Sequence, residues 1–245
     1  MSTFEKRHVD ALGENRERLS EGVPEREEIR ELLLEMDDEI PPSPFPNTRV
    51  LGLNLYRHWS GEYRTALWFP NPHNNYRVNE IYLRYGKSEA EIRSFRNVIP
   101  PADDEPPALG GFPAHIHLAI GLCANGFFYQ LVIGPKAWLD LNNFCEVLKR
   151  TEGTRIFSAL SSLDEDYVIR WGEMEAKVHD FESPQEFAEL LKNPRGGAMA
   201  GRDFLVIRKD VSACDRIIVT TESIENEIRR MFPVFDAVAL RRPPA

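Results

Sequence analysis

The amino-acid sequence predicts an α+β fold, in which helices pack on a mainly antiparallel sheet of five to seven strands, preceded by an acidic helical arm. The first observation is that apolar residues recur at helical spacing before Asn47 and mainly at every second position after it. The second is the pair Asn125-Gly126 inside an apolar run, which is typical of a tight β-hairpin. The third is that helical segments interrupt hairpins and do not alternate regularly with single strands, so we do not expect a doubly wound parallel sheet.

The composition is that of a globular protein with a buried core. Of the 245 residues, 42% are hydrophobic and 28% are charged, which is typical of neither a disordered chain nor a disulfide scaffold. The three cysteines are far apart and odd in number, as reduced thiols are, and we therefore expect a cytoplasmic protein. The first residues lack the apolar stretch of a secretory signal, and no run of about 18 apolar residues predicts a membrane partner.

An acidic segment opens the chain. Residues 1–40 hold 6 Lys and Arg against 13 Asp and Glu, so most of the formal net charge of −9 lies there. From Pro24 the pattern predicts a helix, because acids crowd its positive end and apolar residues recur at helical spacing. These apolar residues are Ile29, Leu32, Leu33 and Met36. We expect the stripe to dock either on the rest of the chain or on a second copy in a homo-oligomer, and residues 2–22 to form either a marginal helix or a mobile arm.

Proline-rich residues 41–46 predict a stiff connector, because proline cannot continue a helix. We therefore place the acidic arm and connector at 1–47 and a single α+β domain at 48–245. Alternating or mainly apolar runs predict strands at 50–59, 64–69, 79–85, 114–123, 127–133, 167–171 and 203–209. The first two of these strands are expected to pair as a hairpin, and residues 175–181 are expected to extend the strand that ends at 171.

Capping boxes and helical spacing predict the helices. Ser88 with Glu91, and Ser183 with Glu186, have the spacing of three that a capping box requires. The predicted helices cover 88–98, 135–148, 155–160, 183–193 and 221–231. Residues 100–113 form a long loop rich in proline and glycine, and a loop of this length in a compact domain is often functional or mobile.

The strand over 114–123 has two unlike faces. Its aliphatic residues point to one side and predict the core, whereas His115 and His117 point to the other side, beside the small residues Ala119 and Gly121. If the flanking strands are its neighbours in one sheet, their polar sides form a ligand groove with it. The candidate ligand-binding residues are Tyr56, His58, Glu80, Tyr82, Arg84, His115 and His117. The alternative is a solvated or helix-covered face of hydrogen-bonded polar residues.

Two further patterns leave a metal site open. Alternate residues of a strand point the same way, so His115 and His117 are suited to a divalent metal if a third ligand comes from elsewhere in the chain. The run Glu175-Ala176-Lys177 has the acid-x-Lys form of a nuclease core, with Asp164 or Asp166 as the partner acid. Both patterns are short enough to arise by chance, so we commit to no metal ligand and predict no other cofactor.

A family resemblance is carried by the hairpin and its surroundings. The residues that carry it are His117, Ile120, Gly121 and Leu122 in one strand, the pair Arg57-His58 upstream, and Trp171 in a later strand. With the order hairpin, helix, Trp-containing strand, helix, strand and terminal helix, these features resemble the YktB-like family of uncharacterised bacterial proteins. The resemblance covers 49–235 and implies an α+β fold, and it implies no function because that family has no assigned activity. Neither the acidic arm nor the loop at 100–113 has a counterpart in the family.

From these patterns we expect a non-catalytic accessory protein that binds a small molecule or a protein partner with its polar sheet face. No complete catalytic constellation can be assembled from the sequence, and the alternative that stays open is a metal-dependent hydrolase or nuclease built around His115 and His117 or around the acid-x-Lys run. Nucleic acid is a less favoured partner, because the only basic cluster is modest. This cluster consists of Arg195, Arg202, Arg208 and Lys209.

Overall fold

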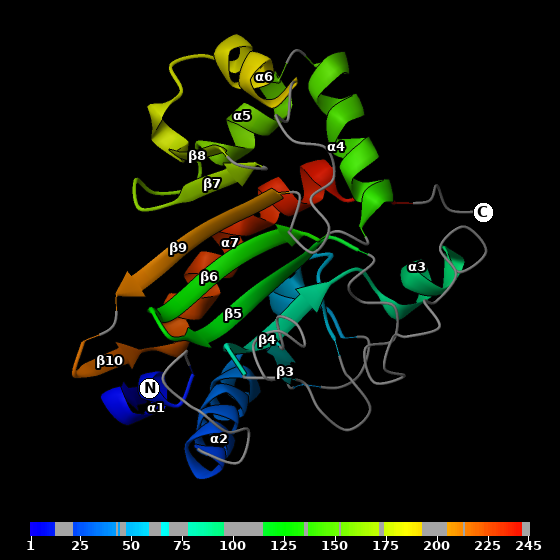
Figure 1. The fold of residues 1–245 in the computed structure, drawn as a ribbon. Coiled ribbons are helices and arrows are strands. Elements are labelled where there is room, and N and C mark those ends of the chain that lie inside the picture. Colours follow the sequence, from blue (N-terminus) through cyan, green and yellow to red (C-terminus); the bar gives the residue numbers. More distant parts are fainter. Residues whose placement is uncertain are drawn as a thin grey trace.

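The structure is a computed structural model, drawn as a ribbon in Figure 1. It describes residues 1–12, 22–42, 44, 48–58, 65–68, 78–95, 115–134, 137–151, 153–171, 174–192, 205–212 and 214–241. The loop at 100–113 and the connection between the expected strands at 50–59 and 64–69 lie outside these residues.

An antiparallel sheet runs through the molecule. Seven of its strands follow one another in the order β2 (Tyr56–Arg57), β4 (Glu80–Gly86), β5 (His117–Cys123), β6 (Gly126–Ile133), β9 (Leu205–Ser212), β7 (Val168–Trp171) and β8 (Met174–Lys177). A further strand, β3 (Thr65–Trp68), also pairs with β4. Every pairing is antiparallel. The predicted α+β class with a mainly antiparallel sheet is confirmed, and so is the hairpin of β5 and β6 around Gly126, whose φ of 127° suits glycine.

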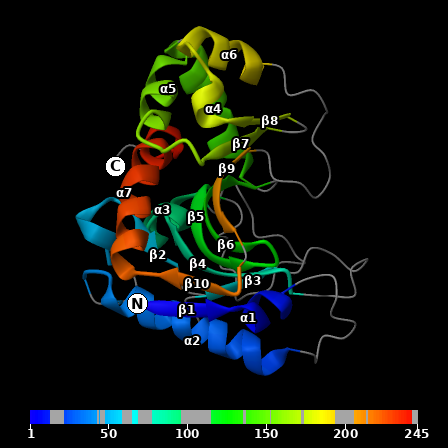
Figure 2. The same ribbon diagram turned by 90° about the vertical axis from the view of Figure 1, so that its left-hand side faces the viewer.

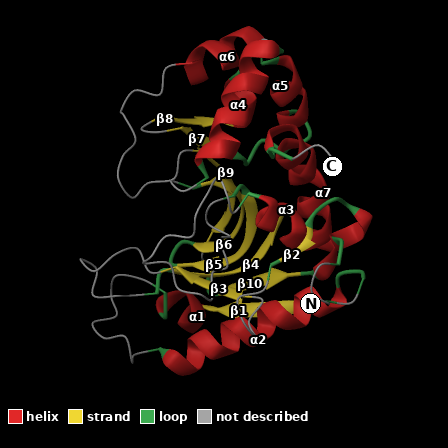
Figure 3. Ribbon diagram, turned by 90° about the vertical axis from the view of Figure 1, so that its right-hand side faces the viewer, coloured by secondary structure: helices red, strands yellow, loops and turns green. Residues whose placement is uncertain are grey.

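The described helices lie along this sheet and at one end of it. They are α1 (Lys6–Asp10), α2 (Val23–Glu39), α3 (Glu89–Ser94), α4 (Trp138–Arg150), α5 (Thr154–Leu160), α6 (Pro184–Lys192) and α7 (Thr221–Val238). Figure 2 and Figure 3 show α7 against one face of the central strands, with α4, α5 and α6 gathered near β7 and β8. The predicted capping boxes form: Ser88 Oγ accepts from the Glu91 N–H, and Ser183 Oγ accepts from the Glu186 N–H at 3.1 Å.

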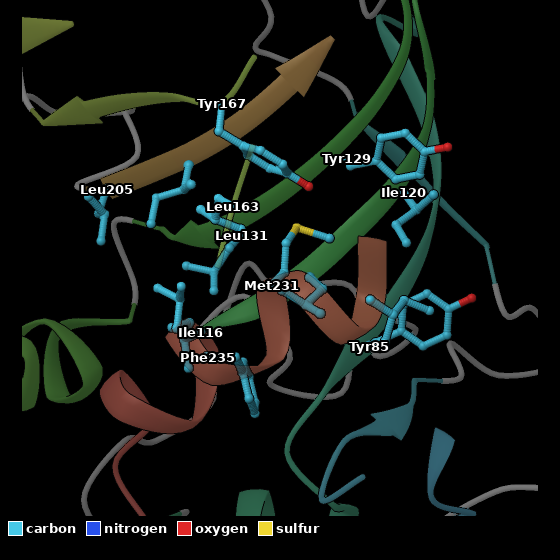
Figure 4. Packing of buried hydrophobic residues seen from close by; sticks show 14 of the residues in the cluster. Tyr85, Ile116, Ile120, Tyr129, Leu131, Leu163, Tyr167, Leu205, Met231 and Phe235 are labelled. Carbon is cyan, nitrogen blue, oxygen red and sulfur yellow. The ribbon is translucent and has the colours of Figure 1, made fainter. Parts of the chain in front are cut away.

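The core lies between the sheet and α7. Alternate residues of β4, β5 and β6 point toward the helix and are buried, as the period of two predicts. Figure 4 shows how Met231 and Phe235 of α7 pack among the sheet residues Ile120 and Leu131 and the neighbouring Ile116. This burial fixes which face of the sheet belongs to the core, because a slip of one residue would turn every aliphatic side chain to the other face.

The N-terminal segment does not form a separate helical arm. Residues Ser2–Glu5 form strand β1, which pairs with β10 (Arg216–Val219), a strand that the sequence pattern did not predict. Phe4 anchors β1, because its ring is fully buried and its centroid lies 5.4 Å from that of Phe127. Helix α2 packs along β1 and β4 with Ile29, Leu33 and Met36 buried, so its apolar stripe docks on its own chain.

A buried ion pair fastens the end of α2 to the sheet. Arg57 Nε donates to Asp37 Oδ1 at 2.8 Å, and Arg57 Nη2 donates to the Ile40 carbonyl at 2.6 Å. The Tyr85 hydroxyl donates to the same Asp37 oxygen at 2.9 Å. Since three elements share one carboxylate, the acidic helix is an integral part of the fold.

Three strand expectations are wrong in detail. Of the described residues 50–58, only Tyr56–Arg57 is a strand, because Val50–Gly52 forms a 3-10 turn in which Leu51 has a φ of 52°. The strands β2 and β3 do not pair with each other, and both pair with β4. Residues 175–181 do not extend β7: strand β8 turns back to pair with it antiparallel, and a 3-10 turn at Val178–Asp180 follows.

Candidate functional site

The predicted site lies on the sheet face that is turned away from α7. The His58 N–H donates to the Arg84 carbonyl at 3.0 Å, and Arg84 pairs with Ala119 in β5. The same row continues through Gln130 in β6 to Arg208 in β9. Because residues directly opposite each other in a sheet point to the same side, these five side chains share one face.

Gly86 makes room for the His58 ring beside His117. In the next row Gly86 pairs with Tyr56 on one side and with His117 on the other. A Cβ on Gly86 would stand 3.1 Å from His58 Nε2, so the imidazole lies over the glycine. Cross-strand neighbours on one face are about 5 Å apart at their Cβ atoms, and His117 is therefore next to this ring. The Tyr56 hydroxyl accepts from Arg49 Nε at 3.2 Å.

Two backbone carbonyls set the tautomers of the imidazoles. His58 Nε2 lies 2.8 Å from the Lys87 carbonyl oxygen, and His117 Nδ1 lies 3.1 Å from the His115 carbonyl oxygen. A carbonyl can only accept, so each of these ring nitrogens carries the proton and donates it. In the neutral rings the other nitrogens, His58 Nδ1 and His117 Nε2, are acceptors.

Burial keeps these imidazoles neutral and leaves Arg84 as the cation beside them. Burial, followed by the Arg84 charge, lowers the pKa of His58 to about 3. Burial lowers the pKa of His117 to about 4, against the hydrogen bond to the His115 carbonyl. The Arg84 side chain is itself buried, with 1% of the residue exposed, and burial lowers its pKa to about 10.

A buried ion pair lies directly behind the two imidazoles. Lys87 Nζ donates to the two Asp140 oxygens at 2.7 and 2.9 Å, and both side chains are 0% exposed. Asp140 also accepts the N–H of Ile116 at 2.9 Å and the N–H of Leu240 at 2.7 Å. Burial by itself raises the pKa of Asp140, but its hydrogen bonds and the Lys87 charge lower it overall. The carboxylate thus joins the ends of β4 and α7 and the start of β5 and α4.

His115 belongs to this ion pair and not to the predicted groove. Its Nδ1 lies 3.2 Å from Lys87 Nζ, which donates to it, and its ring packs against Phe95 with centroids 5.3 Å apart. Burial lowers the pKa of His115. Its backbone carbonyl lies 3.1 Å from Nδ1 of the neighbouring site residue His117.

Glu80 and Tyr82 lie toward the start of β4, whereas Arg84 and Gly86 lie toward its end. Glu80 and Gly86 are six positions apart, which is roughly 20 Å along a strand. Glu80 accepts from Arg208 Nη1 at 3.0 Å, and burial raises the pKa of Glu80. The Tyr82 ring packs against that of Phe128 with centroids 6.4 Å apart.

Gly121 does not leave open space for a ligand above the sheet. A Cβ on Gly121 would stand 2.0 Å from the Ile81 carbonyl oxygen and 2.7 Å from the Tyr82 Cβ. The glycine is needed because β4 approaches β5 closely at this pair. Ala119 is buried in a small apolar cluster with Tyr82, so this part of the face is packed.

The seven candidate residues therefore divide into three groups. Tyr56, His58, Arg84 and His117 meet at the end of β4 and β5 that is near Gly86. His115 joins the ion pair of Lys87 and Asp140. Glu80 and Tyr82 lie toward the other end of β4, with Tyr82 only two positions from Arg84, whose pKa it raises against the effect of burial. The sequence pattern missed Lys87 and Asp140. The signal for Asp140 was a carboxylate that shares a helical face with Phe144 and Leu148, both of which are buried.

The residues of the nuclease alternative have other partners. Glu175 Oε2 accepts from Arg170 Nε at 2.5 Å on the exposed β7–β8 hairpin. Asp164 accepts from Lys209 Nζ at 2.5 Å and from Arg230 Nη1 at 2.9 Å. In the part of the chain that the structure describes, no three His, Cys, Asp or Glu side chains are grouped so as to hold a metal ion.

Comparison with models of known protein families and with curated protein sequences gives no match to this chain. Among the described helices, none combines the length and the apolar character needed to cross a membrane.

Proposed function

We propose that this protein is a non-catalytic binding protein that holds a small oxyanion at His58, Arg84 and His117. The observation that carries the proposal is the fully buried guanidinium of Arg84 on a sheet face where its neighbours are neutral imidazoles. A bound anion would stabilise this charge, since burial lowers the pKa of Arg84 and a nearby negative charge raises it.

Geometry supports a small ligand at this place. His58 and Tyr56 are only partly buried, whereas His117 is 8% exposed and Arg84 is nearly inaccessible. We therefore place the proposed ligand between the partly exposed side chains of β2 and the buried cation of β4. Arginine is well suited to hold such a ligand, because a guanidinium donates two parallel hydrogen bonds to a carboxylate or a phosphate.

A binding role fits the arrangement better than a catalytic one. The tautomers of both rings are fixed by backbone carbonyls, and the pKa values of about 3 and 4 lie far from neutral pH. A general acid or base works best when its pKa lies near the operating pH. These imidazoles are therefore suited to orienting a ligand and not to moving its protons.

The test is a calorimetric titration with inorganic phosphate, sulfate and acetate as separate probes. At least one probe should bind saturably to the native protein, and Arg84→Met should weaken its binding at least about tenfold. Arg170→Met, which changes an exposed arginine of β7, is the matched control and should leave the affinity unchanged. The function is wrong if no probe binds saturably, and the site is wrong if Arg84→Met binds as the native protein does.

A further inference from the structure

The small sheet of β1 and β10, which lies beside α2 in Figure 2, has one buried face and one exposed face. Phe4 and Ile217 are opposite each other in the two strands, and both are buried in the core. The alternate residues point to the other side, where Ile218 is 55% exposed and Met1, just before β1, is 73% exposed. This outer face therefore has apolar surface that a partner could bury.

The backbone of β10 has hydrogen-bonding groups that point away from β1. The Lys6 N–H donates to the Asp215 carbonyl at 3.2 Å, so this opposed pair is hydrogen-bonded. Bonded and non-bonded pairs alternate along antiparallel strands, and the N–H and C=O groups of Arg216 and Ile218 therefore point to the other edge of β10. In the described part of the chain β10 pairs with β1 alone, so this edge has groups that a further strand can bond.

A hollow at the start of β10 carries an excess of positive charge. Its volume is about 490 Å³, and its lining residues are Glu5, Lys6, Arg7, Asp215 and Arg216. Arg7 forms an ion pair with Glu5 at 2.9 Å, which leaves two cations and one carboxylate. Among the residues that the structure describes, neither Lys6 nor Arg216 forms an ion pair with a carboxylate. The hollow is thus suited to an acidic group of a partner.

We propose that β10 binds an extended acidic peptide, which adds to its outer edge as an antiparallel strand. The outward N–H and C=O groups favour an extended segment, because a helix uses its own backbone groups internally. Residues of the added strand that lie opposite Arg216 and Ile218 are two positions apart. A carboxylate opposite Arg216 and an apolar side chain opposite Ile218 give the motif apolar-x-acid, read from the N-terminus of the peptide.

A second copy of this chain is the competing occupant of the edge, and its charges fit less well. In antiparallel registers of two β10 strands centred on residues 216, 217 or 218, Arg216 lies opposite Arg216, Ile218 or Thr220 of the other copy. None of these residues supplies a carboxylate, and like charges directly opposite each other destabilise a sheet. Self-association is therefore an outcome of the test and not the proposal.

The experiment measures the affinity of the full chain for a labelled synthetic peptide, Ser-Thr-Val-Thr-Glu-Thr-Ser, by fluorescence anisotropy at pH 7. The peptide should bind saturably. The peptide Ser-Thr-Val-Glu-Thr-Thr-Ser has the same composition but turns its carboxylate to the other side of the strand, and it should bind about threefold more weakly or worse.

Substitutions in β10 separate the edge from the charge. Ile218→Pro removes an outward N–H that β1 does not use, so it should abolish binding while thermal denaturation shows a folded protein. Ile218→Thr keeps this N–H and should only weaken binding. Arg216→Ser should weaken binding about threefold or more, whereas the matched control Arg170→Ser, at an exposed arginine of β7, should leave it unchanged.

Cys214 provides a local readout on the native protein. Its exposed thiol donates to the outward carbonyl of Arg216 at 2.9 Å, which is a carbonyl that an added strand would bond. The peptide should therefore slow the alkylation of Cys214 by iodoacetamide, as read by mass spectrometry. Cys145, a half-buried thiol of α4, should react at the same rate with and without the peptide.

The outcomes are independent of the oxyanion site, because they involve a different sheet. The inference is wrong if neither peptide binds, if the two peptides bind equally, or if a folded Ile218→Pro variant binds as the native protein does. Unchanged alkylation of Cys214 at saturating peptide would place the peptide elsewhere and overturn it too. If sedimentation shows a native dimer that Ile218→Pro dissociates, the occupant is a second copy and the acidic peptide is wrong.

Discussion

Arg84 and Arg208 lie in one cross-strand row on the same face of the sheet, and they differ in what surrounds them. Arg208 donates to Glu80 at 3.0 Å and to Asp210 at 2.8 Å, and its guanidinium lies 4.3 Å from the centre of the Phe128 ring. Burial alone lowers the pKa of Arg208, but its hydrogen bond to Asp210 and the nearby acidic groups raise it overall. Arg208 therefore braces β4, β6 and β9 against one another.

Arg84 shares its face of the sheet with two neutral imidazoles, those of His58 and His117. Burial lowers its pKa to about 10, although the nearby Tyr82 raises it. The difference teaches that a buried arginine is a structural brace where carboxylates raise its pKa. Where burial outweighs the neighbouring groups, as at Arg84, the pKa is lowered, and an added anion would raise it again. This contrast is why we propose the ligand at Arg84 and not at Arg208.

The largest expected change in stability comes from breaking the buried ion pair of Lys87 and Asp140, which lies near Arg84. Asp140→Ala leaves the Lys87 charge and the N–H groups of Ile116 and Leu240 buried without this acceptor. We expect the free energy of unfolding to fall by about 3–5 kcal/mol in urea denaturation at pH 7. Asp166→Ala, at an exposed carboxylate, should change it by less than about 0.5 kcal/mol. Equal losses in the two variants would show that the ion pair does not organise this end.

The two arginines should also differ in what they contribute to stability. Arg208→Met leaves Glu80 and Asp210 without their shared cation and should lower the free energy of unfolding by about 2–3 kcal/mol. Arg84→Met removes a charge that burial disfavours, and it should cost less than about 1 kcal/mol. Urea denaturation of both variants checks this. If Arg84→Met lowers the free energy of unfolding as much as Arg208→Met does, the proposed difference between the two arginines is wrong.

Acid should destabilise the protein because it protonates His58 and His117, the imidazoles beside Arg84. The pKa values of His58 and His117 in the folded protein, about 3 and 4, lie below the unfolded value of about 6.5. The unfolded chain therefore binds more protons, and stability is lost as the pH falls from about 6.5 toward 4. Between pH 7 and 5.5 each imidazole should cost about 1 kcal/mol.

The measurement for this pH effect is urea denaturation at several pH values. His58→Gln and His117→Gln should each flatten the pH dependence, because glutamine does not titrate in this range. His179→Gln is the matched control at an exposed histidine and should leave the slope as in the native protein. A native stability that is constant between pH 7 and 5.5 would contradict the neutral imidazoles.

Much of the central fold could be predicted from the sequence because its signals are local. The β5–β6 hairpin has both an alternating pattern and an Asn-Gly turn, and the capped helices have their own start signals. The pairing of β1 with β10 could not be predicted, since each has four residues and the pair is more than 200 residues apart in sequence. The N-terminal strand is held by the burial of Phe4, which is a tertiary effect.

The site could be predicted only where alternation decides it. The alternation of side chains along each strand predicts that His58, Arg84 and His117 lie on one face of the sheet, as their pairing positions show. It could not show that His115 leaves this face, since the contact with Lys87 and Asp140 depends on α4 and on the C-terminal segment. It also could not show that β4 occupies the space beside Gly121.

The central claim is that Arg84, and not Arg208, binds a small oxyanion. The most direct test is phosphate affinity, measured by calorimetry, in the matched variants Arg84→Lys and Arg208→Lys. Both substitutions keep a positive charge and lose the two-pronged geometry of the guanidinium. The account predicts that Arg84→Lys weakens phosphate binding at least about tenfold, while Arg208→Lys leaves the affinity within about twofold of native. Equal weakening in the two variants, or an effect confined to Arg208→Lys, would contradict it.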